Sequence, residues 1–299
     1  MKILVTGSNG QVGSCLVKQL TELSEIECLA VDRDQLDITD RDAVNKLVNE
    51  FKPDAIINAA AHTAVDKAEQ EVELSYSINR YGPEYLAQAA NSVGASILHI
   101  STDYVFAGDK EGSYVETDAV APQGVYGHSK LAGEQAVAAA CPRYIILRTA
   151  WVFCETGNNF VKSMLRLAQS RDELGVVADQ FGSPTYAGDI AHALIVMVQA
   201  LYNGSTAYGI YHFSGMPHVS WQQFAVEIFK QAKAQGLLNK EQSKDGHKEM
   251  QVNAITSDQY PTPAKRPANS KLDCQKIDQA FGIKPSDWQS ALKQLASYQ

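Results

Sequence analysis

The sequence lacks paired cysteines and long apolar runs. Its five cysteines are scattered and include no C-x-x-C pair: Cys15, Cys28, Cys141, Cys154 and Cys274. This pattern favours reduced thiols in a cytoplasmic protein over a disulfide framework or a zinc site. No segment approaches the ~18 consecutive apolar residues that a membrane helix needs, and the N-terminus shows no cleavage signal. We therefore expect a cytoplasmic protein that has no membrane partner.

An excess of basic residues is also absent. The 299-residue chain holds 26 lysines and arginines against 34 acidic residues, which gives a formal net charge of −8. Without basic residues to neutralise phosphates, a nucleic acid is not expected as a partner. The composition, 45% hydrophobic and 20% charged, is that of a globular protein. We expect a partner that is a small molecule.

Short apolar runs alternate with longer helical patterns through the first half of the chain, as is typical of a parallel α/β sheet. Strands are expected at residues 3–5, 26–31, 55–57, 96–100 and 144–147. Helices are expected at residues 11–23, 39–51, 74–92 and 125–140. Thr39 and Asp42 resemble a capping box, which would begin the second of these helices.

Beyond Trp151 the alternation loosens. Helices are expected at residues 160–169, 190–202, 221–234 and 288–297, with an exposed polar connection at 235–251 and extended, proline-rich chain at 260–266. The predicted fold is therefore α/β. Residues 1–150 would form a Rossmann-type, doubly wound parallel sheet to which later segments return. Residues 151–299 would form a smaller C-terminal domain that mainly binds substrate.

Three glycines, Gly7, Gly10 and Gly13, lie between the first expected strand and the first helix. A dinucleotide site needs such a turn, because the backbone must approach a pyrophosphate and the free N–H groups of a helix N-terminus must face it. This placement favours a nicotinamide cofactor over an ordinary turn. Asp32, at the end of the second strand, suits a ribose hydroxyl, whereas Arg33 suits a 2′-phosphate. NADPH and NADH both remain open, with NADPH expected first.

Tyr126 and Lys130 are four residues apart, so both side chains leave the same face of the expected helix. A nearby ammonium favours the phenolate of a tyrosine and lowers its pKa toward the working range of an acid–base catalyst. Thr102 ends the fourth expected strand, where its hydroxyl can donate to a substrate carbonyl. Each feature alone also fits a surface pair or a polar turn. Their conjunction with the glycine turn, in this order, predicts a reductase.

These residues resemble those of the extended short-chain dehydrogenase/reductase family and, within it, the reductases of 4-keto sugar nucleotides. The resemblance covers nearly the whole chain, and its most specific motifs are NAAAHTAVDKAE at residues 58–69 and YPTPAKRPANSKL at residues 260–272. It implies hydride transfer to C4 of a dTDP-linked 4-dehydro-6-deoxyhexose, which would give dTDP-L-rhamnose. Tyr126 would donate the proton, Lys130 would hold the nicotinamide ribose and Thr102 would polarise the carbonyl.

The motifs and the resemblance together give two sets of expected contacts. The cofactor contacts are Gly7, Gly10, Gln11, Val12, Asp32, Arg33, Asp37, Ile38, Ala60, Ala61, Thr63, Tyr126 and Lys130. The substrate contacts are Thr102, Asp103, Trp151, Asn159 and Arg266. A structural salt bridge explains Arg266 as well as contact with a diphosphate does, and tight packing is an alternative explanation for the alanines after the third strand.

Other functions share parts of this residue pattern. Related dehydratases carry Glu after the Asp of this motif, and Tyr104 occupies that place here, so dehydration is disfavoured. A sugar-nucleotide epimerase and a non-catalytic, nucleotide-binding regulatory relative remain alternatives. Some relatives dimerise through magnesium at positions that correspond to Cys15, Gly188 and Gln289, none of them a strong ligand for a hard cation. Magnesium is therefore doubtful, no metal site is expected, and the chain is expected to be a monomer or a metal-free homodimer.

Overall fold

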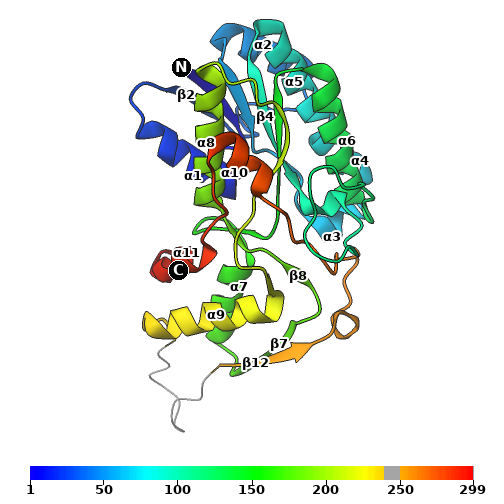
Figure 1. Ribbon diagram of the computed structural model, residues 1–299, viewed down its shortest axis with the longest axis vertical. Coiled ribbons are helices and arrows are strands. Elements are labelled where there is room, and N and C mark those ends of the chain that lie inside the picture. The colour runs from blue at the N-terminus through cyan, green and yellow to red at the C-terminus, as the bar shows by residue number, and fades with distance from the viewer. Residues whose placement is uncertain (239–249, 299) are drawn as a thin grey trace.

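The computed structural model describes residues 1–238 and 250–298, and its centre is a parallel sheet of six strands (Figure 1). The strands lie in the order β10-β5-β4-β3-β1-β2. Their bounds are β1 Lys2–Thr6, β2 Glu27–Val31, β3 Ala55–Asn58, β4 Ser96–Thr102, β5 Tyr144–Thr149 and β10 Gly209–His212. The order reverses between β1 and β3, which is the pattern of a doubly wound sheet. The predicted fold class is confirmed.

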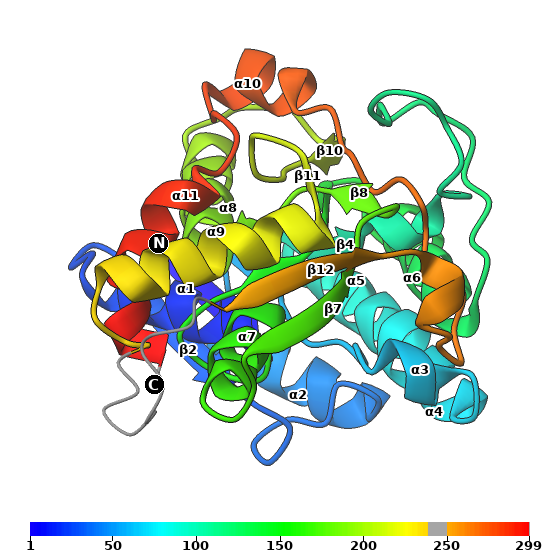
Figure 2. The ribbon, with the colours of Figure 1, turned by 90° about the horizontal axis from the view of Figure 1, so that it is seen from below.

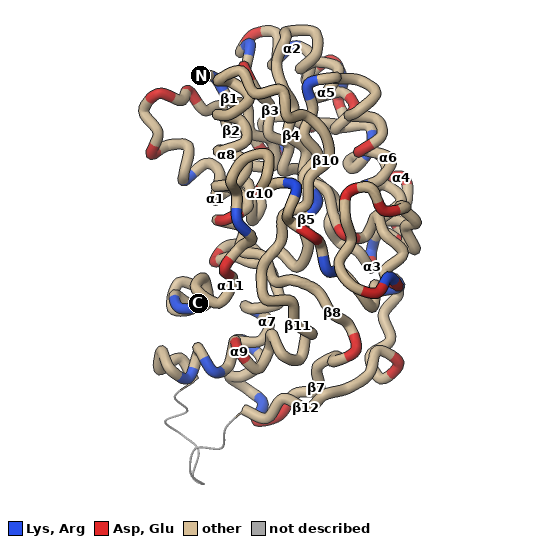
Figure 3. The backbone as a smooth tube through the Cα atoms, viewed as in Figure 1, with Lys and Arg blue, Asp and Glu red and all other residues tan. Residues whose placement is uncertain are grey.

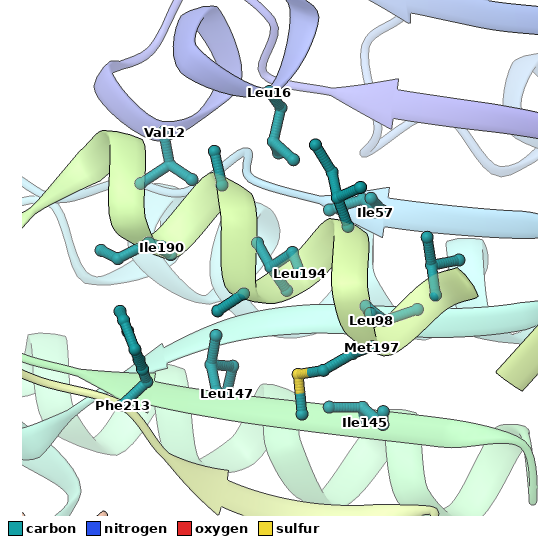
Figure 4. Close-up of a cluster of buried hydrophobic side chains, with 14 of the residues drawn as sticks. Val12, Leu16, Ile57, Leu98, Ile145, Leu147, Ile190, Leu194, Met197 and Phe213 are labelled. Atoms are coloured by element: carbon teal, nitrogen blue, oxygen red, sulfur yellow. The ribbon is translucent and has the colours of Figure 1, made fainter. Parts of the chain in front are cut away.

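Helices cover both faces of the sheet. One face carries α1 (Gln11–Thr21), α8 (Ala187–Tyr202) and α10 (Gln275–Phe281), and the other carries α2 (Arg41–Phe51), α5 (Gly82–Val93) and α6 (Val125–Ala140). Figure 4 shows the first core, in which Leu16 of α1 and Leu194 of α8 pack with Ile57 and Leu147 of the sheet. Because strands buried on both faces need apolar side chains on both, β3 is buried along its whole length.

Most of the later elements pack around a second apolar core, separate from the core around the sheet and beyond the carboxyl ends of the strands (Figures 1 and 2). They include α7 (Phe160–Ala168), α9 (Trp221–Ala234), α11 (Trp288–Ala291) and the parallel pair β7 (Glu173–Val177) and β12 (Gln251–Ile255). Trp288, which is fully buried, packs edge-on against Phe224 of α9. The short pairs β6 (Val152–Phe153) with β9 (Thr185–Tyr186), and β8 (Phe181–Gly182) with β11 (Val219–Ser220), lie between the two cores. The division of the chain at residue 150 stays a prediction.

Two local predictions were wrong. The N-cap of α2 is Asp40, whose side chain accepts from the N–H groups of Asp42 and Ala43, whereas Thr39 donates to Asp37. The helix expected at residues 74–92 is present, and it runs without a break through α4 (Val72–Tyr76), a π-helical segment η1 (Ser77–Tyr81) and α5. The helix expected to reach residue 297 ends at Ala291 and continues as 3-10 turns, with a non-helical residue at Gln294. Residues 239–249 of the expected connection lie outside the described residues.

Charged residues of both signs are distributed over the fold. Figure 3 shows acidic and basic residues interspersed along the coloured part of the chain. None of the helices in residues 1–238 and 250–298 has the length and apolar character needed to cross a membrane.

Candidate active site

The backbone of the glycine turn is in close contact with the backbone of the loop after β3. Gly7 has a φ of +72°, and a Cβ there would lie 2.6 Å from the backbone nitrogen of Ala60. A Cβ at Gly13 would overlap the carbonyl of Gly7. Gly10 is the N-cap of α1 and has no side chain with which to cap it, so the N–H groups of the first turn are available to an anion. The cradle therefore fits the pyrophosphate of a dinucleotide.

The two residues that begin α1 have different surroundings. Val12 is part of the core beneath the turn. The side-chain oxygen of Gln11 accepts a hydrogen bond of 3.1 Å from Asn159, which also caps α7 and donates to the carbonyl of Cys154. All the polar atoms of the Asn159 side chain are thus engaged within the protein. Its expected contact with substrate stays a prediction, and the structure gives Asn159 the task of positioning Gln11.

The expected adenosine-ribose residues follow β2. The Asp32 carboxylate accepts from the N–H of Arg33 at 2.7 Å; Asp32 is partly buried, and Arg33 begins an exposed turn. Asp37 accepts from the hydroxyl and the N–H of Thr39, and these hydrogen bonds lower the pKa of Asp37. Ile38 is buried, and its side chain occupies the space that a Cβ at Gly82 would need.

The loop after β3 lies beside the glycine turn. Ala60 is the backbone that Gly7 approaches, and its N–H donates to the side chain of Asn58 at 3.0 Å. Ala61 and Thr63, the other expected contacts in this loop, are partly buried and exposed, respectively. Asn79 of the π-helical segment fixes this loop. Its side-chain amide accepts from the N–H of His62 and donates to the carbonyl of His62 and to the hydroxyl of Ser129 on α6. A π-helical segment has no characteristic spacing of apolar residues, so the sequence pattern did not single out Asn79.

The structure brings Thr102 and Tyr126 together at the carboxyl edge of the sheet. Thr102 ends β4, and Tyr126 lies in the first turn of α6. Burial raises the pKa of Tyr126, and a hydrogen bond with the Thr102 side chain opposes that rise. This direction is opposite to the one expected from the sequence. A phenol held neutral is suited to donate a proton, because it is fully protonated at neutral pH.

Lys130 lies one helical turn beyond Tyr126 and is almost completely buried, with 2% of its surface exposed. Its ammonium donates to the carbonyl of Ile100 at 2.6 Å, and its Nζ lies 3.3 Å from Nε2 of His99. Burial lowers the pKa of Lys130 to about 8, although the charge of Glu134 raises it. The lysine therefore stays mostly protonated at pH 7 but releases its proton at a much lower pH than a free lysine.

His99 is a residue that the sequence analysis missed. The side chain of Asn58 has a fixed orientation, because its oxygen accepts from the Thr6 hydroxyl and the Ala60 N–H. Its NH₂ group must then donate to Nδ1 of His99, 3.0 Å away. Burial holds the pKa of His99 well below its usual value, so the ring is neutral and its proton is on Nε2, facing Lys130. An N–H that faces the lysine favours the neutral amine, in addition to burial.

Glu134 forms a buried ion pair beneath the site. Its two oxygens accept from Nε and an NH₂ group of Arg148 at 2.9 and 2.7 Å, and Ser101 donates to the same carboxylate at 2.6 Å. Both charged side chains are only 3% exposed. The carboxylate thus ties α6 to β4 and β5.

Asp103 and Tyr104 follow Thr102 directly. The Thr102 hydroxyl donates to Oδ1 of Asp103 at 2.9 Å, and burial raises the pKa of Asp103 to about 6. Contacts with the side chains of Ser270 and Thr102 oppose this rise. The Tyr104 ring packs edge-on against Tyr126 with 5.3 Å between ring centroids. Arg266 donates to the Tyr104 hydroxyl and forms an ion pair with Asp66.

The two most specific motifs therefore contact each other. Asp66 and Glu69 belong to the motif at residues 58–69, and Asp66 also accepts from the N–H of Ala264 in the second motif. Glu69 accepts from the N–H of Val125 at the N-terminus of α6, where the helix dipole favours a carboxylate. The structural salt bridge considered for Arg266 is present, and contact with a diphosphate stays a prediction.

Trp151 lies where the sheet meets the second core. It has a φ of +50°, and its ring stacks on Trp221 with 3.5 Å between centroids. A Cβ at Gly182 would lie 2.5 Å from the same ring. The backbone strain and the tight packing fix the indole, but its expected contact with substrate stays a prediction.

Comparisons with known proteins agree with this geometry. The family described as "RmlD substrate binding domain" matches residues 1–298. A dTDP-4-dehydrorhamnose reductase from Aggregatibacter actinomycetemcomitans is 54% identical over 298 residues, which cover 99% of each protein. The enzyme of that name from Escherichia coli K12 is 41% identical, over 99% of this chain and 97% of the relative.

Solved structures give the same result. A dTDP-4-dehydrorhamnose reductase from Clostridium acetobutylicum superposes with a TM-score of 0.88 at 44% identity and covers 98% of this chain and 97% of its own. One from Bacillus anthracis, in complex with NADP, has a TM-score of 0.87 at 36% identity with the same coverage. The resemblance found in the sequence motifs is confirmed. The chain belongs to the RmlD substrate binding domain family.

Proposed function

We propose that this chain is a dTDP-4-dehydrorhamnose reductase, which reduces the C4 keto group of dTDP-4-dehydro-6-deoxy-L-mannose to give dTDP-L-rhamnose. The observation that carries the proposal is the placement of Thr102, Tyr126 and Lys130 at one edge of the sheet, beside the glycine cradle. Relatives that are up to 54% identical over the full length bear this name. The neighbour in complex with NADP has the same fold, which supports a nicotinamide dinucleotide as cofactor.

The cofactor, when bound, supplies a hydride to C4 of the sugar. The residues that would hold it are the cradle of Gly7, Gly10 and Gly13, with Asp32 or Arg33 at the ribose end. Tyr126 donates its phenolic proton to the oxygen on C4, because burial keeps the phenol neutral until negative charge develops there. The Thr102 hydroxyl turns from Asp103 to the same oxygen. Two preorganised donors of this kind supply a few kcal/mol of stabilisation.

Lys130 serves Tyr126 and the cofactor. A group with a pKa of about 8 can supply or accept a proton near neutral pH, so it can restore the proton that Tyr126 gives away. In its protonated state it also presents donors to a ribose hydroxyl. The Ile100 carbonyl holds the Nζ in place, and His99, whose tautomer Asn58 fixes, can donate to the neutral amine.

Two further properties belong to this proposal. We propose that the protein works in the cytoplasm, which is supported by cysteines that are all free. We also propose a monomer or a metal-free homodimer, because Gly188 and Gln289 bring no carboxylate to the positions at which some relatives bind magnesium.

The test is a stoichiometric assay of the purified protein. Wild type should consume one NADPH for each dTDP-4-dehydrorhamnose, whereas an epimerase would recycle its cofactor. Tyr126→Phe should lose at least a hundredfold in kcat, which is typical for removal of a general acid. Tyr202→Phe, at an exposed tyrosine on α8, is the matched control and should keep full activity. Absence of substrate-dependent NADPH loss would refute the reaction, and an active Tyr126→Phe would refute the mechanism.

A further inference from the structure

A pair of thiols lies beneath the glycine turn and has no part in the mechanism above. Cys15 is in the second turn of α1, and Cys154 follows directly after β6. The two sulfurs and a carboxylate oxygen of Glu155 all lie within 4.8 Å of one another. Both cysteines are free; Cys15 is partly exposed, and Cys154 is buried.

The two thiols differ in character. Hydrogen bonds from Cys15 and from Thr156, whose hydroxyl oxygen is 3.2 Å from the sulfur, lower the pKa of Cys154 to about 7. The same contact with Cys154, together with burial, raises the pKa of Cys15. The two thiols therefore titrate as a pair that shares one proton, and Cys15, which is partly exposed, is the member that a dissolved disulfide can reach.

A disulfide explains this cluster better than a metal does. A structural zinc site needs four protein ligands, and the group formed by the described residues offers three. One of these, Glu155, already accepts a hydrogen bond of 2.7 Å from the Tyr186 hydroxyl.

We propose that Cys15 and Cys154 form a reversible disulfide with glutathione disulfide, or a similar small disulfide, as the oxidant, and that this bond weakens binding of the cofactor. Cys15, the partly exposed thiol of the pair, attacks as the thiolate one sulfur of the oxidant and expels one thiolate, which leaves a mixed disulfide on Cys15. Cys154 then loses its proton, attacks the Cys15 sulfur and expels the second thiolate. The protein loses two electrons and two protons, and the oxidant becomes two thiols.

The link to the cofactor is Gln11. The Cys154 sulfur lies 3.8 Å from the carbonyl oxygen of Gln11 and 3.7 Å from its side-chain oxygen. The hydroxyls of Ser14 and Thr156 are also in contact, at 3.0 Å. The two sulfurs must approach to about 2.05 Å to bond, so either the start of α1 or the segment 154–156 must move. Either movement disturbs the turn that presents N–H groups to the pyrophosphate. The effect on binding thus rests on the proposed cofactor site.

The test treats fully reduced holoprotein with glutathione disulfide in the presence of EDTA. We expect the number of free thiols to fall from five to three and proteolytic digests to contain a peptide in which Cys15 is joined to Cys154. The Kd for NADPH should rise about tenfold and return to its first value after dithiothreitol. Cys28→Ser is the control and should behave as wild type.

The variants separate the two parts of the inference. Cys154→Ser should stop at a glutathione adduct on Cys15, and Cys15→Ser should form neither product; Cys154→Ala serves if the serine variant folds poorly. Absence of the linked peptide in folded wild type would overturn the disulfide. A linked protein that binds NADPH as tightly as the reduced form would overturn the link to the cofactor. Neither result depends on which sugar nucleotide is reduced, so failure of the proposed function would remain distinguishable.

Discussion

Replacing Lys130 by methionine should abolish reduction and yet leave the folded apoprotein at least as stable as wild type near pH 7. Burial lowers the pKa of Lys130 from 10.5 to about 8. Each pKa unit corresponds to about 1.4 kcal/mol, so the buried ammonium destabilises the fold by about 3 kcal/mol. Methionine fills a similar volume without a charge. It leaves the carbonyl of Ile100 without its partner, which costs about 1–3 kcal/mol. We expect a net stabilisation of about 0–2 kcal/mol.

The pH dependence gives the sharper test. The native state releases the Lys130 proton near pH 8, whereas the unfolded chain holds it to about pH 10.5. Between these values the unfolded state binds more protons, so the unfolding free energy of wild type rises with pH. By about pH 9.5 the rise is about 2 kcal/mol, and Lys130→Met lacks it. The stability advantage of the variant at pH 7 should therefore disappear or reverse at pH 9.5.

Urea unfolding of the apoprotein at both pH values measures this difference. Lys46→Met, at an exposed position on α2, is the control and should titrate as wild type does. The reasoning would be refuted if Lys130→Met were several kcal/mol less stable than wild type at pH 7 with a difference that does not change at pH 9.5. That outcome would mean that the ammonium is stabilised in the fold.

Three further substitutions test the site. Glu134→Gln leaves the charge of Arg148 buried without its partner, so the unfolding free energy should fall by about 3–5 kcal/mol in urea titrations; a loss below about 1 kcal/mol would contradict the buried pair. Thr102→Val should lower kcat/KM by about 10²–10³ and lower the thermal stability, because Asp103 and the Tyr104 N–H lose a buried partner; a loss of kcat/KM of less than tenfold in the folded variant would remove Thr102 from catalysis. Arg33→Ala should raise KM for NADPH about tenfold and leave KM for NADH unchanged, because hydrogen bonds to a charged phosphate are worth about 1.5–3 kcal/mol. Equal effects on both cofactors would show that Arg33 does not contact the 2′-phosphate.

Periodicity was sufficient to predict five strands of the sheet and the helix that carries Tyr126 and Lys130. This was possible because each strand and each helix has its own pattern of apolar residues within a short stretch of the sequence. The N-cap of α2 was missed since Asp40 and Thr39 are adjacent and both are good caps. Only the structure shows that the Thr39 hydroxyl donates to Asp37 and does not cap the helix.

The polar residues beneath the site were missed for a different reason. Asn58 and His99 are 41 residues apart in the sequence, and they meet because β3 and β4 are adjacent and in register at these two positions. A register between strands cannot be read from either strand alone. A histidine inside an otherwise apolar strand is the one signal that the sequence offered.

The way α6 runs alongside β4 brings these buried polar groups to their partners. Four residues of helix rise about 6 Å, and two residues of strand rise about 6.6 Å, so the two elements have matching steps. Tyr126 therefore reaches Thr102 when Lys130 reaches the carbonyl of Ile100. One turn further on, Glu134 is held by Arg148 and Ser101, which fixes α6 against both sliding and rotation. A buried ion pair is weak evidence for stability; here it holds the phenol of Tyr126 at the height of the Thr102 hydroxyl.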